Sequence, residues 1–229
     1  MSTDVTRERL LMAAGRVFAE KGFEASTVRE ICAAADVNVA SVNYYFGDKS
    51  QLYLETVRRA HQLRAKERPL PIRSSESTVE LRLHDFIFTI LQRMLGSEHD
   101  PWPGRLMLRE VLQPTQACRE MAEDYFRPHF EYLLGLLGEL LPPGVPAYRQ
   151  RQIGLGVIGQ CLHYRVASEV IQMMTPEEEL KNYYGVDQLA FHITSTVLAS
   201  LTSSPTWECD EKLTEVLRSA RYVQQEDAV

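Results

Sequence analysis

Residues 27–49 read TVREICAAADVNVASVNYYFGDK and hold two short helical patterns separated by a turn. The first pattern starts at Thr27, with Glu30 three residues later, which is the signature of a capping box at a helix start. Its apolar side chains recur at the spacing of one buried helical face: Val28, Ile31, Cys32 and Ala35.

A second short helix is predicted directly after the first. We expect Asp36 and Val37 to form a tight turn and Asn38 to cap the new helix, because an asparagine side chain accepts well from free N–H groups. Val42 and Phe46 then point inward. The face left outside is small and of mixed polarity: Val39, Ala40, Asn43 and Tyr44.

Longer helices flank this pair. Upstream, we expect a helix capped by Thr6 and ended by Gly22, since glycine is preferred where a helix terminates in a left-handed turn. Its buried face comprises Leu10, Ala14, Val17 and Phe18. Downstream, Gly47 and Asp48 interrupt the chain before a connecting helix over residues 49–66. The inner stripe of that helix is Leu52, Tyr53, Val57 and Ala60.

Two short helices joined by a tight turn are typical of a helix-turn-helix, which inserts its second helix into a DNA major groove about 12 Å wide. A small helical bundle without nucleic acid can contain the same turn. The identity of the residues favours the DNA-binding interpretation.

These residues resemble the N-terminal pattern of the TetR family of bacterial transcriptional regulators. The resemblance implies an all-helical homodimer whose N-terminal domain binds an operator, and whose larger C-terminal domain binds a small effector that releases the DNA. Asn43 departs from the family pattern, which usually has a tyrosine there. The matching residues are Phe18, Gly22, Phe23, Thr27, Val28, Ile31, Ala34, Val37, Ser41, Tyr45, Phe46, Lys49 and Leu52.

The resemblance also implies roles for single residues. Arg29 falls where family members read a guanine edge, which a guanidinium fork can contact bidentately. Thr27 matches a residue that holds phosphate at a helix start, and Tyr44, Tyr45 and Lys49 match positions that grip the DNA backbone. Groove contact is expected from Asn38, Val39, Ala40, Ser41 and Asn43, although these could simply be exposed residues of a short helix.

Charge is spread unevenly along the chain, whose net charge is −6. Residues 1–66 contain ten Lys and Arg against eight Asp and Glu, and the remainder contains 15 against 23. An acidic body with a mildly basic end is expected to turn that end toward phosphate.

We expect two domains in an all-α fold, because 229 residues exceed the commonest single-domain size. The DNA-binding domain would span residues 1–66, a linker with several prolines and serines residues 67–77, and the effector-binding and dimerisation domain residues 78–229. Within the latter, apolar spacing predicts helices over residues 79–94, 104–112, 147–173, 186–203 and 210–221, and two more between Pro114 and Leu141, where Pro128 kinks or restarts the chain.

The helix over residues 147–173 is apolar on two sides, and a matching apolar stripe occurs over residues 186–203. Together they could form a four-helix interface across a two-fold axis, although ordinary packing within the chain is an alternative. Gly154, Gly156 and Gly159 fit this interpretation, because glycine lets a neighbouring helix approach closely.

The segments RLMLREVLQP (residues 105–114) and GQCLHYR (residues 159–165) are similar to the C-terminal domain of the CecR-type subgroup. This likeness implies control of efflux or drug-response genes and does not name the effector. An enclosed, mostly apolar pocket is expected, with walls from Met94, Met107, Leu108, Tyr125, Phe126 and Phe130 and polar contacts from Arg109, His129, Gln160 and Tyr164. Arg109 could bind an anionic effector or pair with Glu110 or Glu123.

Other features exclude competing classes. The N-terminus is too charged for a signal peptide, no apolar run is long enough to span a bilayer, and a cytoplasmic protein without membrane contact is expected. The four cysteines and six histidines show no spacing typical of a metal site, so no metal or cofactor is expected. Two rival functions remain: an enzyme using His129 or His163 as a base, and a protein-docking module that has lost DNA binding.

Overall fold

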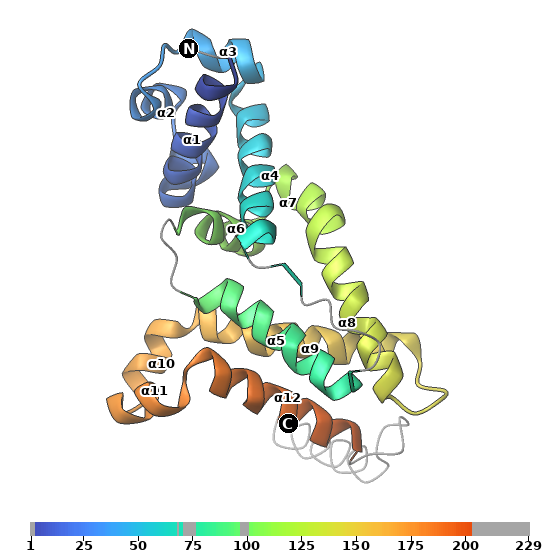
Figure 1. Ribbon diagram of the computed structural model, residues 1–229. Coiled ribbons are helices and arrows are strands. Elements are labelled where there is room, and N and C mark those ends of the chain that lie inside the picture. The colour runs from blue at the N-terminus through green and yellow to red at the C-terminus, as the bar shows by residue number, and fades with distance from the viewer. Residues whose placement is uncertain (1–2, 68, 71–76, 97–100, 203–229) are drawn as a thin grey trace, which may run out of the picture.

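The computed structural model describes residues 3–67, 69–70, 77–96 and 101–202, and every regular element in these ranges is a helix. The all-α fold class is therefore confirmed. In Figure 1 the N-terminal helices stand at the top, three long helices lie side by side at the bottom, and shorter helices lie between the two groups.

The first helix, α1 (Thr3–Ala25), starts earlier than the sequence predicted. Thr6 lies within it and not at its cap, so that prediction is wrong. Gly22 does break the helix as expected, with φ 81° and ψ 177°, and a short helical stretch follows it. Leu10, Ala14 and Phe18 are fully buried on the inner face.

The helix-turn-helix has the predicted caps. In α2 (Val28–Ala35), the Glu30 N–H donates to the Thr27 hydroxyl (3.2 Å) while the Thr27 N–H donates to the Glu30 carboxylate (3.0 Å), which confirms the capping box. In α3 (Ala40–Phe46), the Ala40 N–H donates to the Asn38 side-chain oxygen at 2.9 Å. Asp36 turns the chain between them with φ 52°.

The connecting helix, α4 (Lys49–Glu67), runs from the helix-turn-helix toward the middle of the molecule (Figure 1). Its predicted inner stripe is buried, and Arg64 near its far end is buried too. One continuous helix therefore joins the N-terminal surface to the interior of the protein.

The lower part of the molecule is built from α5 (Val79–Leu95), α8 (Arg127–Leu140), α9 (Ala147–Val166) and α12 (Val186–Thr202). They enclose a second apolar core. Its fully buried members include Leu83, Phe86, Ile87, Leu91, Leu133, Leu137, Cys161, Ala190 and Ile193.

Between the two groups lie α6 (Trp102–Leu112), α7 (Gln116–Met121) and the π-helix η1 (Ala122–Phe126). Pro128 sits in the first turn of α8, directly after the π-helical turn η1, so the hydrogen-bonding pattern changes where a kink or restart was predicted while the backbone stays helical. The N-terminal core takes in side chains from this middle layer: Trp102, Leu106, Ala117, Met121 and Tyr125. That core is thus shared by residues on both sides of the predicted linker.

The sequence prediction of one helix over residues 147–173 is wrong. The chain leaves helical geometry at Ala167 (φ −96°, ψ 16°) and restarts as α10 (Ser168–Met174). Neither a proline nor a glycine marks this break, and the apolar spacing continues across it. Nothing in the spacing therefore indicated that the helix ends there. A further helix that we did not predict, α11 (Glu177–Tyr183), precedes α12. The helix predicted over residues 210–221 lies outside the described residues.

Candidate DNA-binding face and effector cavity

Helix α3 has one buried and one open side. Val42 and Phe46 face the core, with 0% and 8% of their surface exposed, whereas Val39 and Tyr44 on the other side are 47% and 77% exposed. The side chains predicted to enter a groove are all on this open side or next to it: Asn38, Val39, Ala40 and Asn43 are exposed, and Ser41 is half-buried.

Arg29 and Thr27 lie at the start of α2. Arg29 is exposed, and within the described part of the chain it forms no ion pair, so its guanidinium is available to a base edge. The Thr27 hydroxyl is already engaged, because it accepts from the Glu30 N–H and lies 3.0 Å from the Glu30 carboxylate. A phosphate contact by Thr27 would therefore compete with the cap.

The three expected backbone-gripping residues flank α3. The rings of Tyr44 and Tyr45 pack edge to face with their centroids 4.9 Å apart. The Lys49 ammonium lies 4.5 Å above the Phe23 ring and 3.4 Å from the Glu24 carbonyl oxygen. These contacts fix the two tyrosine rings relative to each other and hold the Lys49 ammonium against α1.

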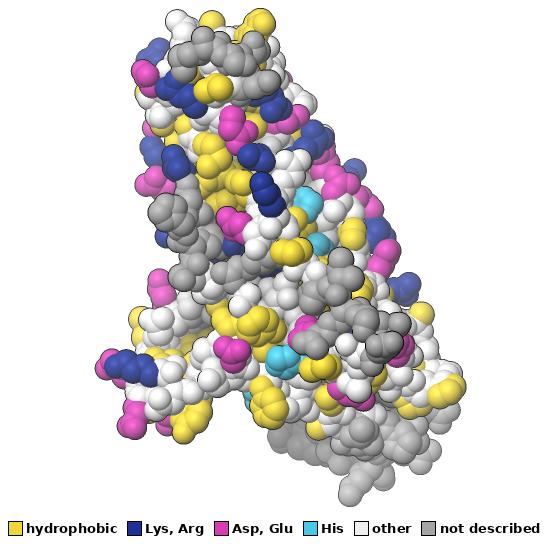
Figure 2. Space-filling model, in the orientation of Figure 1, with side chains coloured by type: hydrophobic (Ala, Val, Ile, Leu, Met, Phe, Trp, Pro, Cys, Tyr) yellow, Lys and Arg dark blue, Asp and Glu magenta, His cyan; other side chains and the backbone are white. Residues whose placement is uncertain are grey.

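The charged side chains follow the same division. On the face drawn in Figure 2, Lys and Arg are frequent over the upper part, which holds the N-terminal helices, and sparse over the lower part. Acidic groups accompany them, for example in the ion pair between Lys21 and Glu30 (2.7 Å). The basic side chains on this face are thus concentrated over the N-terminal helices, with acidic side chains among them.

A cavity of about 760 Å³ lies in the middle of the molecule, within the range typical of small-molecule sites. It is lined by residues of α4, α5, α6, η1, α8 and α9 and is partly open to solvent. All six predicted wall residues line it, and so does His129.

Three predicted polar contacts are placed elsewhere. The Arg109 side chain lies over Gly22, with its Nε 2.6 Å from the position that a Cβ would take there. Its proposed partners bind other groups, since Glu110 accepts from Thr115 and Glu123 pairs with Arg127. Tyr164 lines a separate groove, and Gln160 bonds back to its own helix.

The polar residues that do line the cavity are mostly arginines, which sequence reasoning missed. Arg93 was detectable, because it is a charged residue within the apolar stripe of α5 and is only 5% exposed. The other arginines of the lining gave no such signal, since arginines are common on helix surfaces. The full set is Arg64, Arg93, Arg105, Arg127 and Arg165.

The hydrogen bonds around Arg93 fix the chemistry of His129. Arg93 donates to the Tyr125 hydroxyl (3.1 Å) and contacts His129 Nε2 (2.6 Å). Because arginine can only donate, Nε2 must accept, and the ring proton lies on Nδ1, 2.5 Å from the Tyr125 carbonyl oxygen. Burial, and to a lesser degree Arg93, lowers the pKa of His129, which favours this neutral form.

Helix α6 contacts the cavity with one side and the N-terminal helices with the other. Met107, Leu108 and Val111 line the cavity, while Trp102 and Glu110 face the N-terminal helices and are almost fully buried. The Trp102 ring occupies the space that a side chain at residue 15 would need. The Tyr53 hydroxyl of α4 donates to the Glu110 carboxylate, and burial together with this carboxylate raises the pKa of Tyr53.

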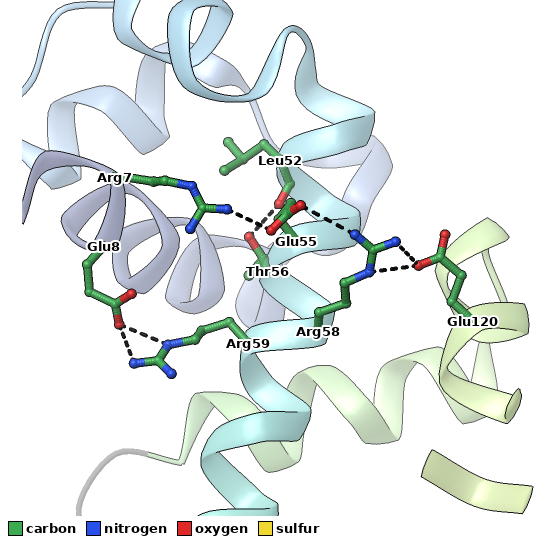
Figure 3. A network of polar contacts seen from close by, with 8 residues as sticks. All are labelled: Arg7, Glu8, Leu52, Glu55, Thr56, Arg58, Arg59 and Glu120. Carbon is green, nitrogen blue, oxygen red and sulfur yellow. Dashed lines mark hydrogen bonds and ion pairs between the residues drawn. The ribbon is translucent and has the colours of Figure 1, made fainter. Parts of the chain in front are cut away.

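A surface network adds a second link between the N-terminal helices and the middle layer (Figure 3). Glu55 pairs with Arg7 of α1 (2.8 Å) and with Arg58 on its own helix (3.3 Å). Arg58 also pairs with Glu120 of α7 at 2.6 Å. A separate pair joins Arg59 to Glu8.

Helices α9 and α12 leave apolar surface uncovered in the single chain. Leu155 of α9 is 61% exposed and Phe191 of α12 is 69% exposed. Of the three glycines singled out in α9, Gly154 is packed against Phe130, whereas Gly156 and Gly159 face open space.

Across the described ranges, no three His, Cys, Asp or Glu side chains are grouped closely enough to hold a metal ion. None of the helices described is both long and apolar enough to cross a bilayer.

Comparison with known proteins gives two family matches. Residues 10–56 match the bacterial regulatory proteins of the tetR family, and residues 79–201 match the C-terminal domain of the HTH-type transcriptional dual regulator CecR. Together they cover most of the described chain.

Individual proteins agree with these matches. The probable HTH-type transcriptional regulator YttP of Bacillus subtilis is 31% identical over 58% of this chain and 63% of its own length, so the chain spans just under two thirds of YttP. The CecR regulator of Shigella flexneri is 29% identical over 74% of this chain and 79% of its own length.

A TetR-like transcriptional regulator from Rhodococcus sp. RHA1 has a similar solved structure, with a TM-score of 0.63 and 19% identity over 89% of this chain and all of that one. This last likeness concerns the fold alone. On the two family matches, which include more than half of the sequence in the C-terminal part alone, the chain belongs to the TetR family of bacterial transcriptional regulators and carries a CecR-type C-terminal domain.

Proposed function

We propose that this protein is a homodimeric repressor that binds a palindromic operator and is released from it by a small molecule. The observation that carries the proposal is the placement of α6, which lines the cavity with one side and supports the N-terminal helices with the other. A ligand that shifts α6 would shift the DNA-binding face with it.

The DNA-binding half rests on the open side of α3 and on Arg29. In a dimer the two α3 helices would enter successive major grooves about 34–36 Å apart. Arg29 and the face from Asn38 to Asn43 would read bases, while Tyr44, Tyr45 and Lys49 would position the protein on phosphates. Thr27 would join them where the cap yields to a phosphate.

The dimer would form through α9 and α12, whose exposed apolar residues and open glycines need a partner. We expect Phe191→Glu to convert the dimer to a monomer in light scattering. Leu112→Glu, a control at an exposed apolar residue of α6, should leave the dimer intact.

Release requires a ligand with different affinity for two shapes of the protein. The Tyr53–Glu110 hydrogen bond and the Arg58–Glu120 ion pair would transmit a displacement of the middle layer to α4, and α4 would carry it to α3. The cavity in this proposal binds its ligand and returns it unchanged, without catalysis.

The test uses the full chain and promoter fragments that flank its own gene, at low ionic strength. We expect binding as a dimer, lost in the double variant Arg29→Ala, Tyr44→Ala and kept in Lys181→Gln, which alters an exposed lysine of α11. A monomeric protein, or one that binds none of these fragments, would contradict the proposal. Compounds that bind the cavity without changing operator affinity would refute the release step alone.

A further inference from the structure

The cavity is strongly cationic in a chain that is acidic overall. Five arginines line it, and no Asp or Glu belongs to its described lining, although the net charge of the chain is −6. Arginine keeps its charge under all physiological conditions. The described lining therefore contains cationic side chains and no anionic ones.

Two of these arginines are built into the interior. Arg64 of α4 is 3% exposed and Arg93 of α5 is 5% exposed, yet both reach the cavity. Placing a guanidinium out of water costs free energy that other groups must offset, and both side chains interact with further groups of the protein. Arg165 is half-buried and Arg127 is exposed, and Arg127 also pairs with Glu123 at 2.7 Å.

The Arg93 site is arranged to donate hydrogen bonds. The Tyr125 hydroxyl accepts from Arg93, which leaves its own proton to donate, and Tyr125 lines the cavity. His129 is held neutral as an acceptor, so it anchors the guanidinium without competing for an anion. A carboxylate or phosphate group, which only accepts, fits the donors that Arg93 and Tyr125 present.

The rest of the lining is apolar and suits a hydrocarbon or aromatic body. Side chains from several helices contribute to it: Ile90, Met94, Leu108, Phe126, Phe130 and Ile158. Because the polar groups are few and of one sign, a neutral or cationic ligand would find no carboxylate in the described lining to pair with.

We propose that the effector is an organic anion with a carboxylate or phosphate head and an apolar body, its head held by Arg93 and Tyr125. This inference rests on the proposed function only in calling the ligand an effector, since binding of the anion to the cavity can be measured without DNA. Arg165 would add charge near the entrance and increase affinity without fixing the orientation of the head.

The experiment compares ligands that share a body and differ in the head. Decanoate, decyl phosphate, decanol and decylammonium form one series, and naphthoate, naphthyl phosphate, naphthalenemethanol and naphthylmethylammonium form a second. Affinities for the full-length protein are measured by calorimetry below micelle-forming concentrations. We expect an anion to bind at least about tenfold tighter than its neutral and cationic counterparts in one series or both. The two anionic heads distinguish a carboxylate from a phosphate.

Variants locate the head. Arg93→Gln and Tyr125→Phe should each weaken anion binding, Arg93→Gln by roughly 10- to 100-fold, the loss expected for a charged hydrogen bond. Both should leave the binding of decanol unchanged. Arg151→Gln on α9, outside the cavity, is the matched control. If Arg93→Gln does not fold, Tyr125→Phe and Arg165→Gln still provide the comparison.

The proposal is overturned if neither series shows an anion preference, which includes the case in which no anion binds below about 1 mM. It is also overturned if the cavity variants bind the preferred anion as tightly as Arg151→Gln does. An anion that binds through Arg93 but leaves operator affinity unchanged supports this inference and contradicts the release step of the proposed function.

Discussion

The DNA-binding face and the effector cavity are built in opposite ways. The face is local: Thr27, Glu30, Asn38 and the inward pair Val42 and Phe46 set two short helices within a span of twenty residues. The cavity is assembled from six helices spread over residues 64–165. Local interactions make the face predictable from the sequence, whereas the cavity depends on how distant helices pack.

The largest effect expected from this contrast concerns stability. Phe18 is fully buried and supports the helices around α3, so Phe18→Ala should lower the free energy of unfolding by about 3–5 kcal/mol. Tyr44→Ala, an aromatic of the same region that is 77% exposed, should change it by less than about 0.5 kcal/mol. Urea unfolding of both variants measures the difference. Equal losses of unfolding free energy in the two variants would mean that packing around Phe18 does not stabilise the DNA-binding face.

Removing the link between the two regions should have a smaller effect. Tyr53→Phe deletes the hydroxyl that donates to the buried Glu110, which keeps its hydrogen bonds from Thr115, and one hydrogen bond to a charged group contributes about 1.5–3 kcal/mol. The variant should also reduce the change in operator affinity that a bound ligand causes. Thermal unfolding and DNA titration with and without ligand test both effects. Unchanged coupling would show that α6 transmits its motion by another contact.

Within the DNA-binding face, base reading and positioning should separate. Arg29→Ala is expected to cost about 1–3 kcal/mol on the operator and to relax the preference at one base pair. Lys49→Ala should weaken operator and random DNA alike and flatten the dependence on salt. Fluorescence anisotropy on both DNAs at several salt concentrations distinguishes them. Equal losses from both variants on both DNAs would reverse this assignment of roles.

The smallest effect is expected from the surface network. Arg58→Gln removes ion pairs with Glu55 and Glu120, and exposed pairs contribute about 0.2–1 kcal/mol. The loss should shrink further at high salt, because exposed charges are screened. Unfolding at two ionic strengths measures it. A loss that is larger and independent of salt would place the network among the main connections between α4 and α7.

The same contrast explains what the sequence could predict. Capping residues and short apolar spacings act over a few positions, so the helix-turn-helix and its open side were predicted residue by residue. The break at Ala167, which no proline or glycine marks, and the helix Glu177–Tyr183, which has no buried apolar face, were missed. The walls of the cavity were predictable because they are apolar, whereas of its arginines only Arg93, which interrupts the apolar stripe of α5, left a signal in the sequence. For Arg109 the sequence left an anionic effector and a carboxylate partner as alternatives, whereas in the structure the side chain lies over Gly22.

Trp102 fills the space beside Gly15, and this limits where the protein can be divided for engineering. A shortened chain cut at the proline-containing connection would lose this indole and the buried side chains that accompany it, and would expose a large apolar hollow to water. Grafting the operator-reading end onto a different sensor would therefore require moving α6 and α7 with it. Such a graft would also carry α5, which precedes α6 in the chain and whose buried side chains belong to the second core, so the new sensor would have to cover the apolar face of α5 as well.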